Sequence, residues 1–426
     1  MVTEATAAED TRFDGWRVVA GLFVVLATTS GLGFYNLGLY LTALKDEHGF
    51  SEGPLSGATA VVFALSGLAG IPIGNYMRDH DPRRLLYLSS VTGALALLLL
   101  GAVDRIWQVY GVYALLAVGF ATGGLVPCYS IVTRWFERRR AVAMSITSTG
   151  LSVGGIVFTP LFEWVIDEQG LGGAAPWMAA AWAVGVAPVA WLLVRSDPAS
   201  VGQHPDGEPP APLAEGEVAP SNGWAFEEAV HTTFFRVVAV AYVLVLGSQV
   251  GGIVHIFNLV DGRIDSSTAA RAVSLVAIAS IVSRLAGGVI ATRVPLQWFT
   301  VVFCFVQATG LLLLGQLDGR TALLASAVLF GASVGNLLML QPLLLSSAFG
   351  VRDYPRIYAR ANAITAIGLV VGPLGVGVLK DALDAYDLPF TLIAGCAATA
   401  GVLLAVAGRE PEVGGAVPTS PAASAP

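Results

Sequence analysis

Apolar residues run in long stretches along this chain, with few polar positions between them. Stretches such as VTGALALLLLGAV at 91–103 lack the alternation over about ten residues that is typical of membrane β-strands. An α-helix needs about 20 predominantly apolar residues to cross a bilayer. The pattern predicts twelve such helices, at about 16–41, 55–77, 84–103, 107–133, 140–166, 176–194, 234–257, 270–291, 297–316, 321–347, 359–381 and 388–407.

The composition supports a membrane protein. Hydrophobic residues make up 55% of the 426 positions and charged residues only 12%, against about 25% in soluble domains. The mean hydropathy is +0.71, and the chain lacks the charges for a water-facing exterior. The net charge of −7 comes from acidic loops and an acidic linker, so we expect no nucleic-acid partner. The fold class predicted is an all-α, polytopic membrane protein with the lipid bilayer as its surroundings.

Basic residues are distributed unevenly between the two sides of the predicted membrane. Sixteen of the 23 Lys and Arg residues fall on the side that holds both termini, and six on the other. Because cytoplasmic loops carry the excess of positive charge, the sequence predicts cytoplasmic termini in a multi-pass protein of the plasma membrane. The N-terminal segment MVTEATAAEDTRFDGW has no basic region of a signal peptide.

Motifs for enzymatic chemistry are not found in this sequence. It contains no His-Glu-x-x-His and no phosphate-binding loop. Its three cysteines, Cys128, Cys304 and Cys396, lie in apolar stretches and are interpreted as small core residues. We therefore expect neither an enzyme nor a primary pump, and no catalytic residues, cofactor or metal site.

An internal repeat defines the domain organisation. AVAMSITSTGLSVGG begins at 141 and ARANAITAIGLVVGP at 359, and they share residues such as Gly150/Gly368 and Gly154/Gly372 at a constant offset of 218. These are the fifth helix of each half, so the repeat is parallel, with the substrate site expected between the halves. The predicted segments are an N-terminal segment (1–15), a first six-helix half (16–194), a flexible linker (195–233), a second half (234–408) and a disordered tail (409–426).

Two motifs carry a family resemblance. The segment FDGW at 13–16 and the segment WFERRRAVA at 135–143, which continues to Thr149 and Gly150, are similar to signatures of the monocarboxylate transporter family. The chain as a whole resembles the major facilitator superfamily, and within it this family with its oxalate/formate-type bacterial relatives. The resemblance implies twelve helices in two halves and alternating access to a central site.

The superfamily motif between the second and third helices is altered here. Residues 74–84 read GNYMRDHDPRR, with the usual Asp-Arg order exchanged and Asp81 in place of a glycine. A cluster of charges survives, and we expect it to lock one conformation. The gating residues expected at this side are Asp79, Arg83, Arg84, Arg138 and Arg139; the alternative is that they only set the orientation of the chain.

Arg284 is the one basic residue that falls on neither side of the predicted membrane. It lies in LVAIASIVSRLAGGVI, about 21 Å along its helix from residue 270. Burying it in hydrocarbon costs at least about 2.5–3.5 kcal/mol, and no Asp or Glu lies at mid-span to pair with it. A guanidinium matches a carboxylate bidentately, and in the resembled family an arginine of the eighth helix binds the substrate. The alternative is a structural arginine bonded to backbone carbonyls.

Two positions depart from the proton-linked members of that family. Ser280 stands where they carry an acidic residue, and Asn36 where they carry a lysine. His255, the only histidine inside a predicted span, is therefore the candidate for proton coupling; a histidine held by a backbone carbonyl is the alternative.

Other polar residues in the spans are candidates for substrate contact. Asn336 and Gln249 lie near the depth of Arg284, with Gln341 further inward, although membrane amides also join helices. The resemblance places Tyr35 and Asn36 of the first helix at the cavity, and Tyr129 of the fourth helix is a further candidate.

The function predicted is secondary transport of small organic monocarboxylates, similar to lactate or pyruvate, with protons as a second partner and a monomer as the functional unit. An antiporter of the oxalate/formate type and an exporter of larger compounds remain the alternatives.

Overall fold

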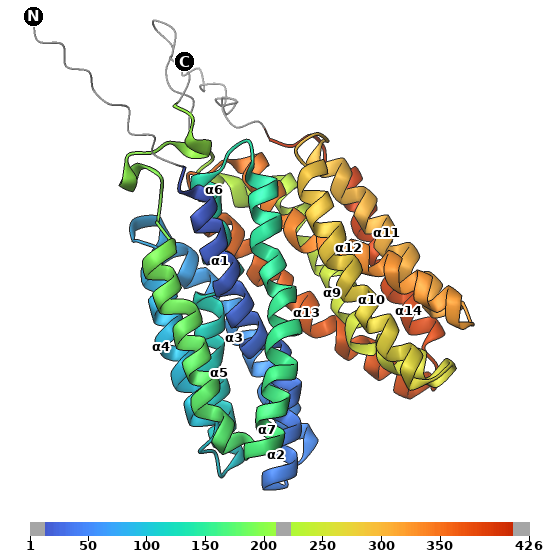
Figure 1. Cartoon of the computed structure of the whole chain (residues 1–426). Helices are drawn as coiled ribbons and strands as arrows, with labels where there is room; N and C mark the ends of the chain where they lie inside the picture. Colours follow the sequence, from blue (N-terminus) through green and yellow to red (C-terminus); the bar gives the residue numbers. More distant parts are fainter. Residues whose placement is uncertain (1–12, 210–222, 412–426) are drawn as a thin grey trace, which may run out of the picture.

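The computed structural model describes residues 13–209 and 223–411 (Figure 1). All regular elements in these two ranges are helices. The segments expected at 1–15, 195–233 and 409–426 fall partly outside the described residues. The longer helices are α1 (Gly15–Ser30), α2 (Leu37–His48), α3 (Glu52–Asp79), α4 (Arg83–Leu100), α5 (Ile106–Thr122), α6 (Leu125–Trp135), α7 (Arg140–Leu193), α9 (Thr233–Arg263), α10 (Ser266–Ile290), α11 (Leu296–Gln316), α12 (Arg320–Phe349), α13 (Tyr354–Leu383) and α14 (Asp387–Ala405).

Eleven continuous helical segments in the described ranges are long and apolar enough to cross a membrane, because α7 contains two of the twelve predicted spans. A straight helix of its 54 residues would be about 81 Å long, far more than a bilayer requires. The chain turns at Gly170, whose φ of 69° favours glycine. Glu47 accepts a 2.6 Å hydrogen bond from the Leu171 amide beside this turn, so the two arms of α7 run in opposite directions (Figure 1).

The first span is interrupted by a π-helical segment, η1 (Gly31–Tyr35), between α1 and α2. Such segments occur frequently at functional sites because they change the direction of the side chains that follow. The Tyr40 hydroxyl donates to the Leu32 carbonyl at 2.9 Å and stabilises the altered backbone. The segment ends with Phe34 and Tyr35, which are 37% and 44% exposed.

The internal repeat has the same packing in both halves. Side chains at Gly150 and Gly154 of α7 would overlap the carbonyls of Phe23 and Ala27 in the first span. At the repeat-related positions Gly368 and Gly372 of α13, side chains would overlap the carbonyls of Val243 and Gly247 in α9. Both helix pairs therefore approach closely along two glycines spaced by four residues, as expected for parallel-related halves.

The two halves make their contacts toward the end of the molecule that holds the termini, and they diverge toward the other end (Figure 1). A Cβ at Gly74 of α3 would lie 2.6 Å from the Ala359 Cβ and 2.7 Å from the Pro355 carbonyl oxygen, both of α13. Arg140 of α7 donates to the Ser346 carbonyl of α12 at 3.4 Å. The inward approach of α3, α7, α12 and α13 closes this end.

The linker between the halves also contacts both of them. Asp206 accepts hydrogen bonds from the backbone amides of Glu137 and Arg138, in the loop before α7. Beyond residues 210–222, which lie outside the described part, the Phe226 amide at the start of α8 (Phe226–His231) donates to Asp353 at 2.9 Å. The described parts of the predicted flexible linker are thus packed against the same end of the protein.

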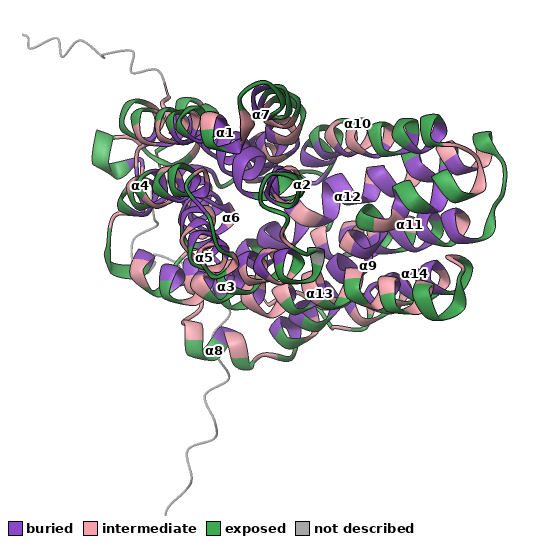
Figure 2. Ribbon diagram, turned by 90° about the horizontal axis from the view of Figure 1, so that it is seen from below, coloured by how far each residue is buried: buried purple, intermediate pink, exposed green. Residues whose placement is uncertain are grey.

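The exterior of the helix bundle is apolar. Val91, Trp107, Trp191 and Val378 are between 65% and 68% exposed, and exposed positions lie around the periphery of both halves (Figure 2). An apolar surface of this extent is unfavourable in water and is expected of helices in contact with lipid. The all-helical, multi-pass membrane fold predicted from the sequence is confirmed.

Candidate functional site

Close packing of α10 against α12 positions Arg284. A side chain at Gly335 of α12 would overlap the Ser280 carbonyl, and one at Gly287 of α10 would overlap the Asn336 amide. With these two helices in contact, the Arg284 side chain extends toward α7, in the other half, and is only 2% exposed. Its Nε donates to the Gly335 carbonyl at 2.9 Å, and its Nη1 donates to the Ser148 carbonyl at 2.6 Å.

The guanidinium joins the two halves of the protein. Gly335 lies in the second half, whereas Ser148 lies in the first. The Ser145 hydroxyl of the first half donates in return to the Arg284 carbonyl at 3.0 Å. Arg284 therefore has the backbone-carbonyl partners that the alternative interpretation expected.

Part of the guanidinium is still available for a ligand. Nη2 has no hydrogen-bond partner among the described residues, and no carboxylate in these residues forms an ion pair with Arg284. A buried cation without a counter-ion is costly. An anion arriving at Nη2 would supply the missing charge and a charge-assisted hydrogen bond.

Two hydroxyl groups lie near the guanidinium. Nη1 is 3.4 Å from Ser152 Oγ, and the Ser152 hydroxyl interacts with that of Tyr35. The Tyr35 ring lies over Gly155 of α7, while its neighbour Phe34 packs against Phe63 and Phe120 of the same half. Since helices of its own half flank η1 on these sides, the exposed face of Tyr35 is directed into the space between the halves.

Tyr129 lies deeper, on the closed side of Arg284. It is fully buried, its ring centroid is 6.1 Å from that of Tyr358 in the other half, and its hydroxyl has no hydrogen-bond partner among the described residues. Access to this hydroxyl requires the halves to separate at the closed end.

The predicted amide residues lie mainly in helix contacts. Asn336 is fully buried and donates to the carbonyl and hydroxyl of Ser283, across the α10–α12 contact. Asn36 accepts from Thr159 at 2.8 Å, and Gln341 donates to Thr365 at 2.9 Å. Gln249 is 4% exposed, with an unpartnered Oε1.

His255 lies away from Arg284, on α9 against α13. Its Nε2 is 3.1 Å from the Pro373 carbonyl oxygen, and its Nδ1 is buried without a hydrogen-bond partner among the described residues. The ring centroid is 5.9 Å from that of Tyr386, which lines a cavity of about 480 Å³ together with Asn258, Arg263 and Lys380. The structure therefore brings Tyr35 close to Arg284 but leaves His255 outside this cluster.

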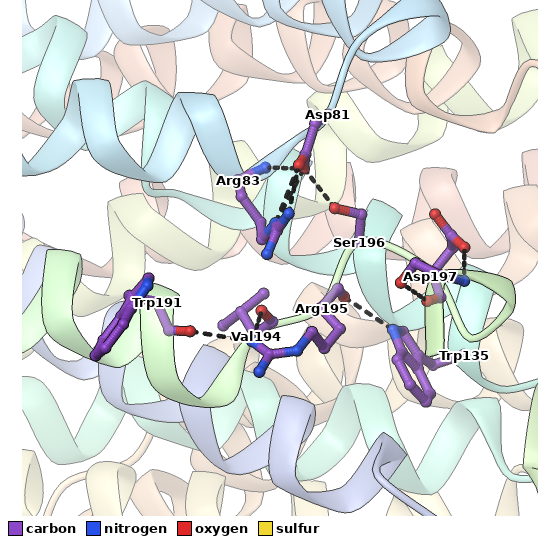
Figure 3. Close-up of polar contacts among 9 residues, drawn as sticks. Asp81, Arg83, Trp135, Trp191, Val194, Arg195, Ser196 and Asp197 are labelled. Carbon is purple, nitrogen blue, oxygen red and sulfur yellow. Dashed lines mark hydrogen bonds and ion pairs between the residues drawn. The ribbon is translucent and has the colours of Figure 1, made fainter. Parts of the chain in front are cut away.

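Asp81 is at the centre of a polar network at the closed end (Figure 3). It accepts hydrogen bonds from Arg83 Nη2 at 2.9 Å and from the Ser196 hydroxyl at the start of the linker. Partial burial favours a higher pKa for Asp81, but the hydrogen bonds from Arg83 and Ser196 outweigh it and hold the pKa below its usual value. The network fixes the loop between α3 and α4 to the linker.

The five expected gating residues make no ion pair between the two halves in the described part of the chain. Arg83 binds Asp81, Asp79 is 3.9 Å from Arg78, and Arg138 binds Glu208 of the linker. Arg84 is exposed, and Arg139 lines a small cavity with Phe13, Trp16 and Asp206.

Other residues connect the halves at this end. Arg356 donates to Asn75 at 3.0 Å, Arg78 is 3.9 Å from Asp353, and Arg140 donates to Ser346. One sequence signal points to Arg356: it is the repeat partner of Arg138, at the same offset of 218. Ser148 and Ser152 gave none, because serine is common in membrane helices for packing reasons alone. In the described ranges, no group of three His, Cys, Asp or Glu residues could hold a metal ion.

Comparison with known proteins identifies the family. The model of the Major Facilitator Superfamily matches residues 23–373. The chain belongs to this superfamily. A monocarboxylate transporter 13 from Rattus norvegicus is 25% identical over 400 residues, covering 91% of this chain and 87% of that protein. An MFS-type transporter from Gibberella moniliformis is 25% identical over 421 residues, covering 95% and 92%.

A solved structure gives the same fold. The fucose:proton symporter FucP of E. coli superposes with a TM-score of 0.68 at 14% sequence identity, covering 92% of this chain and 98% of FucP. The predicted superfamily and its two-half, all-helical fold are confirmed. Superfamily members are transporters rather than enzymes, and this chain is a multi-pass membrane transporter by family and fold.

Proposed function

We propose that this transporter carries small organic monocarboxylates across the cytoplasmic membrane by alternating access. The observation that carries the proposal is Arg284: it is buried between the halves, is bonded to one carbonyl of each half, has no carboxylate partner among the described residues and keeps Nη2 free. A monocarboxylate supplies one negative charge and fits this single cationic group. The similarity to monocarboxylate transporters supports the same substrate class.

The excess of basic residues on the side of the termini supports cytoplasmic termini. In that orientation the closed end is cytoplasmic, and Tyr35 faces the outside. A substrate entering from outside would reach Arg284 and compete with the Ser148 carbonyl for Nη1. Loss of that inter-half hydrogen bond would then favour separation of the cytoplasmic ends.

The proton is the second proposed partner, with His255 as its carrier. The unpartnered Nδ1 of this ring and its place beside the cavity at Tyr386 support the assignment. Protonation would add a buried charge against α13, a helix of the closing contact, and so would couple to the movement of the halves.

Uptake into liposomes by the purified full-length protein tests this function. Labelled lactate, pyruvate, formate and oxalate are each supplied with an inward proton gradient, without one, and with unlabelled anion inside. Uptake driven by the proton gradient and lost in Arg284→Ala supports a proton-linked carrier. Uptake only against trapped anion would make the protein an exchanger, and no uptake of any of these anions by folded protein would contradict the proposal.

A further inference from the structure

Ser152 differs from three neighbouring hydroxyl residues of its helical segment. Thr147, Ser148 and Thr149 donate to backbone carbonyls of their own helix, at Ala143 and Ser145. Serine and threonine in membrane helices usually satisfy their hydroxyls in this way. Ser152 donates to no backbone carbonyl in the described part of the chain.

Arg284 gives the physical reason for this difference. The carbonyl four residues before Ser152 belongs to Ser148, and it accepts the 2.6 Å hydrogen bond from Arg284 Nη1. Nη1 also lies 3.4 Å from Ser152 Oγ, so the serine oxygen can accept from the guanidinium while its proton is left for the Tyr35 hydroxyl or for a ligand. The side chain is nine-tenths buried, at 9% exposure. A polar group in this position is costly unless something accepts its proton.

The surroundings limit what that acceptor can be. Ser152 lies between the guanidinium and the half-exposed Tyr35, which faces the space between the halves. A ligand whose carboxylate is bound at Nη2 would place its next carbon close to Ser152 Oγ. An oxygen on that carbon, hydroxyl or oxo, can accept the serine proton, whereas a CH₂ group cannot and leaves the serine with only the Tyr35 hydroxyl beside it.

We propose that Ser152 determines specificity, by donating a hydrogen bond to the 2-oxygen of a 2-hydroxy or 2-oxo monocarboxylate held by Arg284. This inference rests on the proposed function, because it assumes that a carboxylate binds at Arg284. Sites built to hydrogen-bond a substrate oxygen discriminate against analogues that lack it, since the buried protein group is then left unpaired.

Lactate and propionate test the assignment, because they differ only in the 2-hydroxyl group. Uptake of each by the full-length protein in liposomes is measured for the wild type, Ser152→Ala and Thr149→Ala. Thr149 is the matched control, since it lies nearly one turn away and bonds its own helix. We expect Ser152→Ala to lower the Vmax/KM ratio of lactate to propionate by about 5- to 10-fold, as the loss of one hydrogen bond predicts. Thr149→Ala should leave the ratio as in the wild type.

The possible outcomes separate this inference from the proposed function. An equal fall for both acids in Ser152→Ala would mean that Ser152 only positions Arg284, and an unchanged ratio would mean that it does not contact the 2-oxygen; either result overturns the inference while carboxylate transport stands. Thermal unfolding of the purified variant in detergent serves as the folding control. Absence of uptake of both acids by folded wild-type protein would overturn the proposed function, and the Ser152 assignment with it.

Discussion

At the scale of single residues, the Arg284 side chain has two roles. It donates hydrogen bonds to carbonyls of both halves, and it still offers one edge of the guanidinium to an anion. Lysine keeps the charge but has no planar fork, so it cannot fill both roles. We expect Arg284→Lys to raise the KM for a transported carboxylate by about 10- to 100-fold, the equivalent of one charge-assisted hydrogen bond. Uptake kinetics in liposomes measure this change.

The control for this substitution is Arg293→Lys. Arg293 is exposed just beyond the end of α10, so its replacement should leave the KM near that of the wild type. A normal KM in Arg284→Lys would show that charge alone is needed at this position.

Asp81 allows a prediction about pH. Its pKa is held below the usual value because the hydrogen bonds from Arg83 and Ser196 outweigh the effect of burial. A lowered folded-state pKa stabilises the protein above the ordinary carboxyl pKa, and this stabilisation is lost as the pH falls through the folded-state value. We expect Asp81→Asn to lower the Tm by about 1–3 °C at pH 7, a small effect because the pair is partly exposed.

Thermal unfolding of the detergent-solubilised protein between pH 7 and pH 3 measures this effect. The difference between wild type and Asp81→Asn should persist at pH 5 and shrink only below about pH 4. Asp79→Asn is the matched control, since Asp79 lies in the same region, is exposed, and is 3.9 Å from its partner Arg78. A Tm difference between wild type and Asp81→Asn that grew as the pH fell would contradict a lowered pKa of Asp81 in the folded protein.

At this scale, the sequence singles out side chains that are chemically conspicuous. Arg284 stands out because a charge in an apolar run is costly, and the structure brings Tyr35 close to it; their roles in binding stay predictions. The carbonyl partners of Arg284 at Ser148 and Gly335 could not be predicted, since every residue carries a carbonyl and the contact depends on how helices from two halves pack. Ser152 was not singled out for the same reason: its place beside the guanidinium depends on Arg284 binding the Ser148 carbonyl.

At the scale of the helices, the glycines of the repeat permit close packing. Gly154 of α7 lies against the Ala27 carbonyl, and Gly372 of α13 lies against the Gly247 carbonyl. A methyl group at either position overlaps backbone, which cannot move aside as a flexible side chain can. We expect Gly154→Ala and Gly372→Ala each to destabilise the protein by about 1–3 kcal/mol, measured as a lower Tm in detergent.

Gly395→Ala in α14 provides the matched control. A Cβ there meets no atom within 4 Å, so the alanine should be neutral or slightly stabilising through its better helix propensity. Equal Tm values for all three variants would show that the glycine contacts do not limit packing.

The helices were largely predictable because length and apolarity are strong signals. The twelve apolar runs correspond to the helical segments found, and the break near Gly170 falls between the predicted fifth and sixth spans. The π-helical segment at Gly31–Tyr35 was not predicted. It depends on local hydrogen-bond geometry, to which an apolar pattern is insensitive.

At the scale of the whole molecule, the repeat in the sequence predicted two parallel halves, but not which end of the protein would be closed. Alternating-access states share one sequence and differ by a few kcal/mol, so no pattern of residues selects between them. The contacts of the closed end come from α3 and α13, α7 and α10, and α7 and α12. These contacts connect the halves together with Arg78 of the altered motif, which is 3.9 Å from Asp353, whereas the five expected gating residues make no ion pair between the halves in the described part of the chain.

The contact of Gly74 with α13 provides the test at this scale. Valine at this position would clash with Ala359 and with the Pro355 carbonyl when the end is closed, but would not clash once the halves separate there. A clash of about 2–3 kcal/mol shifts a two-state population by roughly 30- to 150-fold. We therefore expect Gly74→Val to favour the opposite state, in which Tyr35 is covered. The measurement is the rate at which a membrane-impermeant thiol reagent labels Tyr35→Cys in a Cys396→Ala background, and Gly74→Val should slow this labelling.

The matched control is Gly53→Val, in the same helix. No atom lies within 4 Å of a Cβ at this position, so the substitution should leave the labelling rate unchanged. Equal rates in the two valine variants would mean that closure does not depend on the approach of α3 to α13.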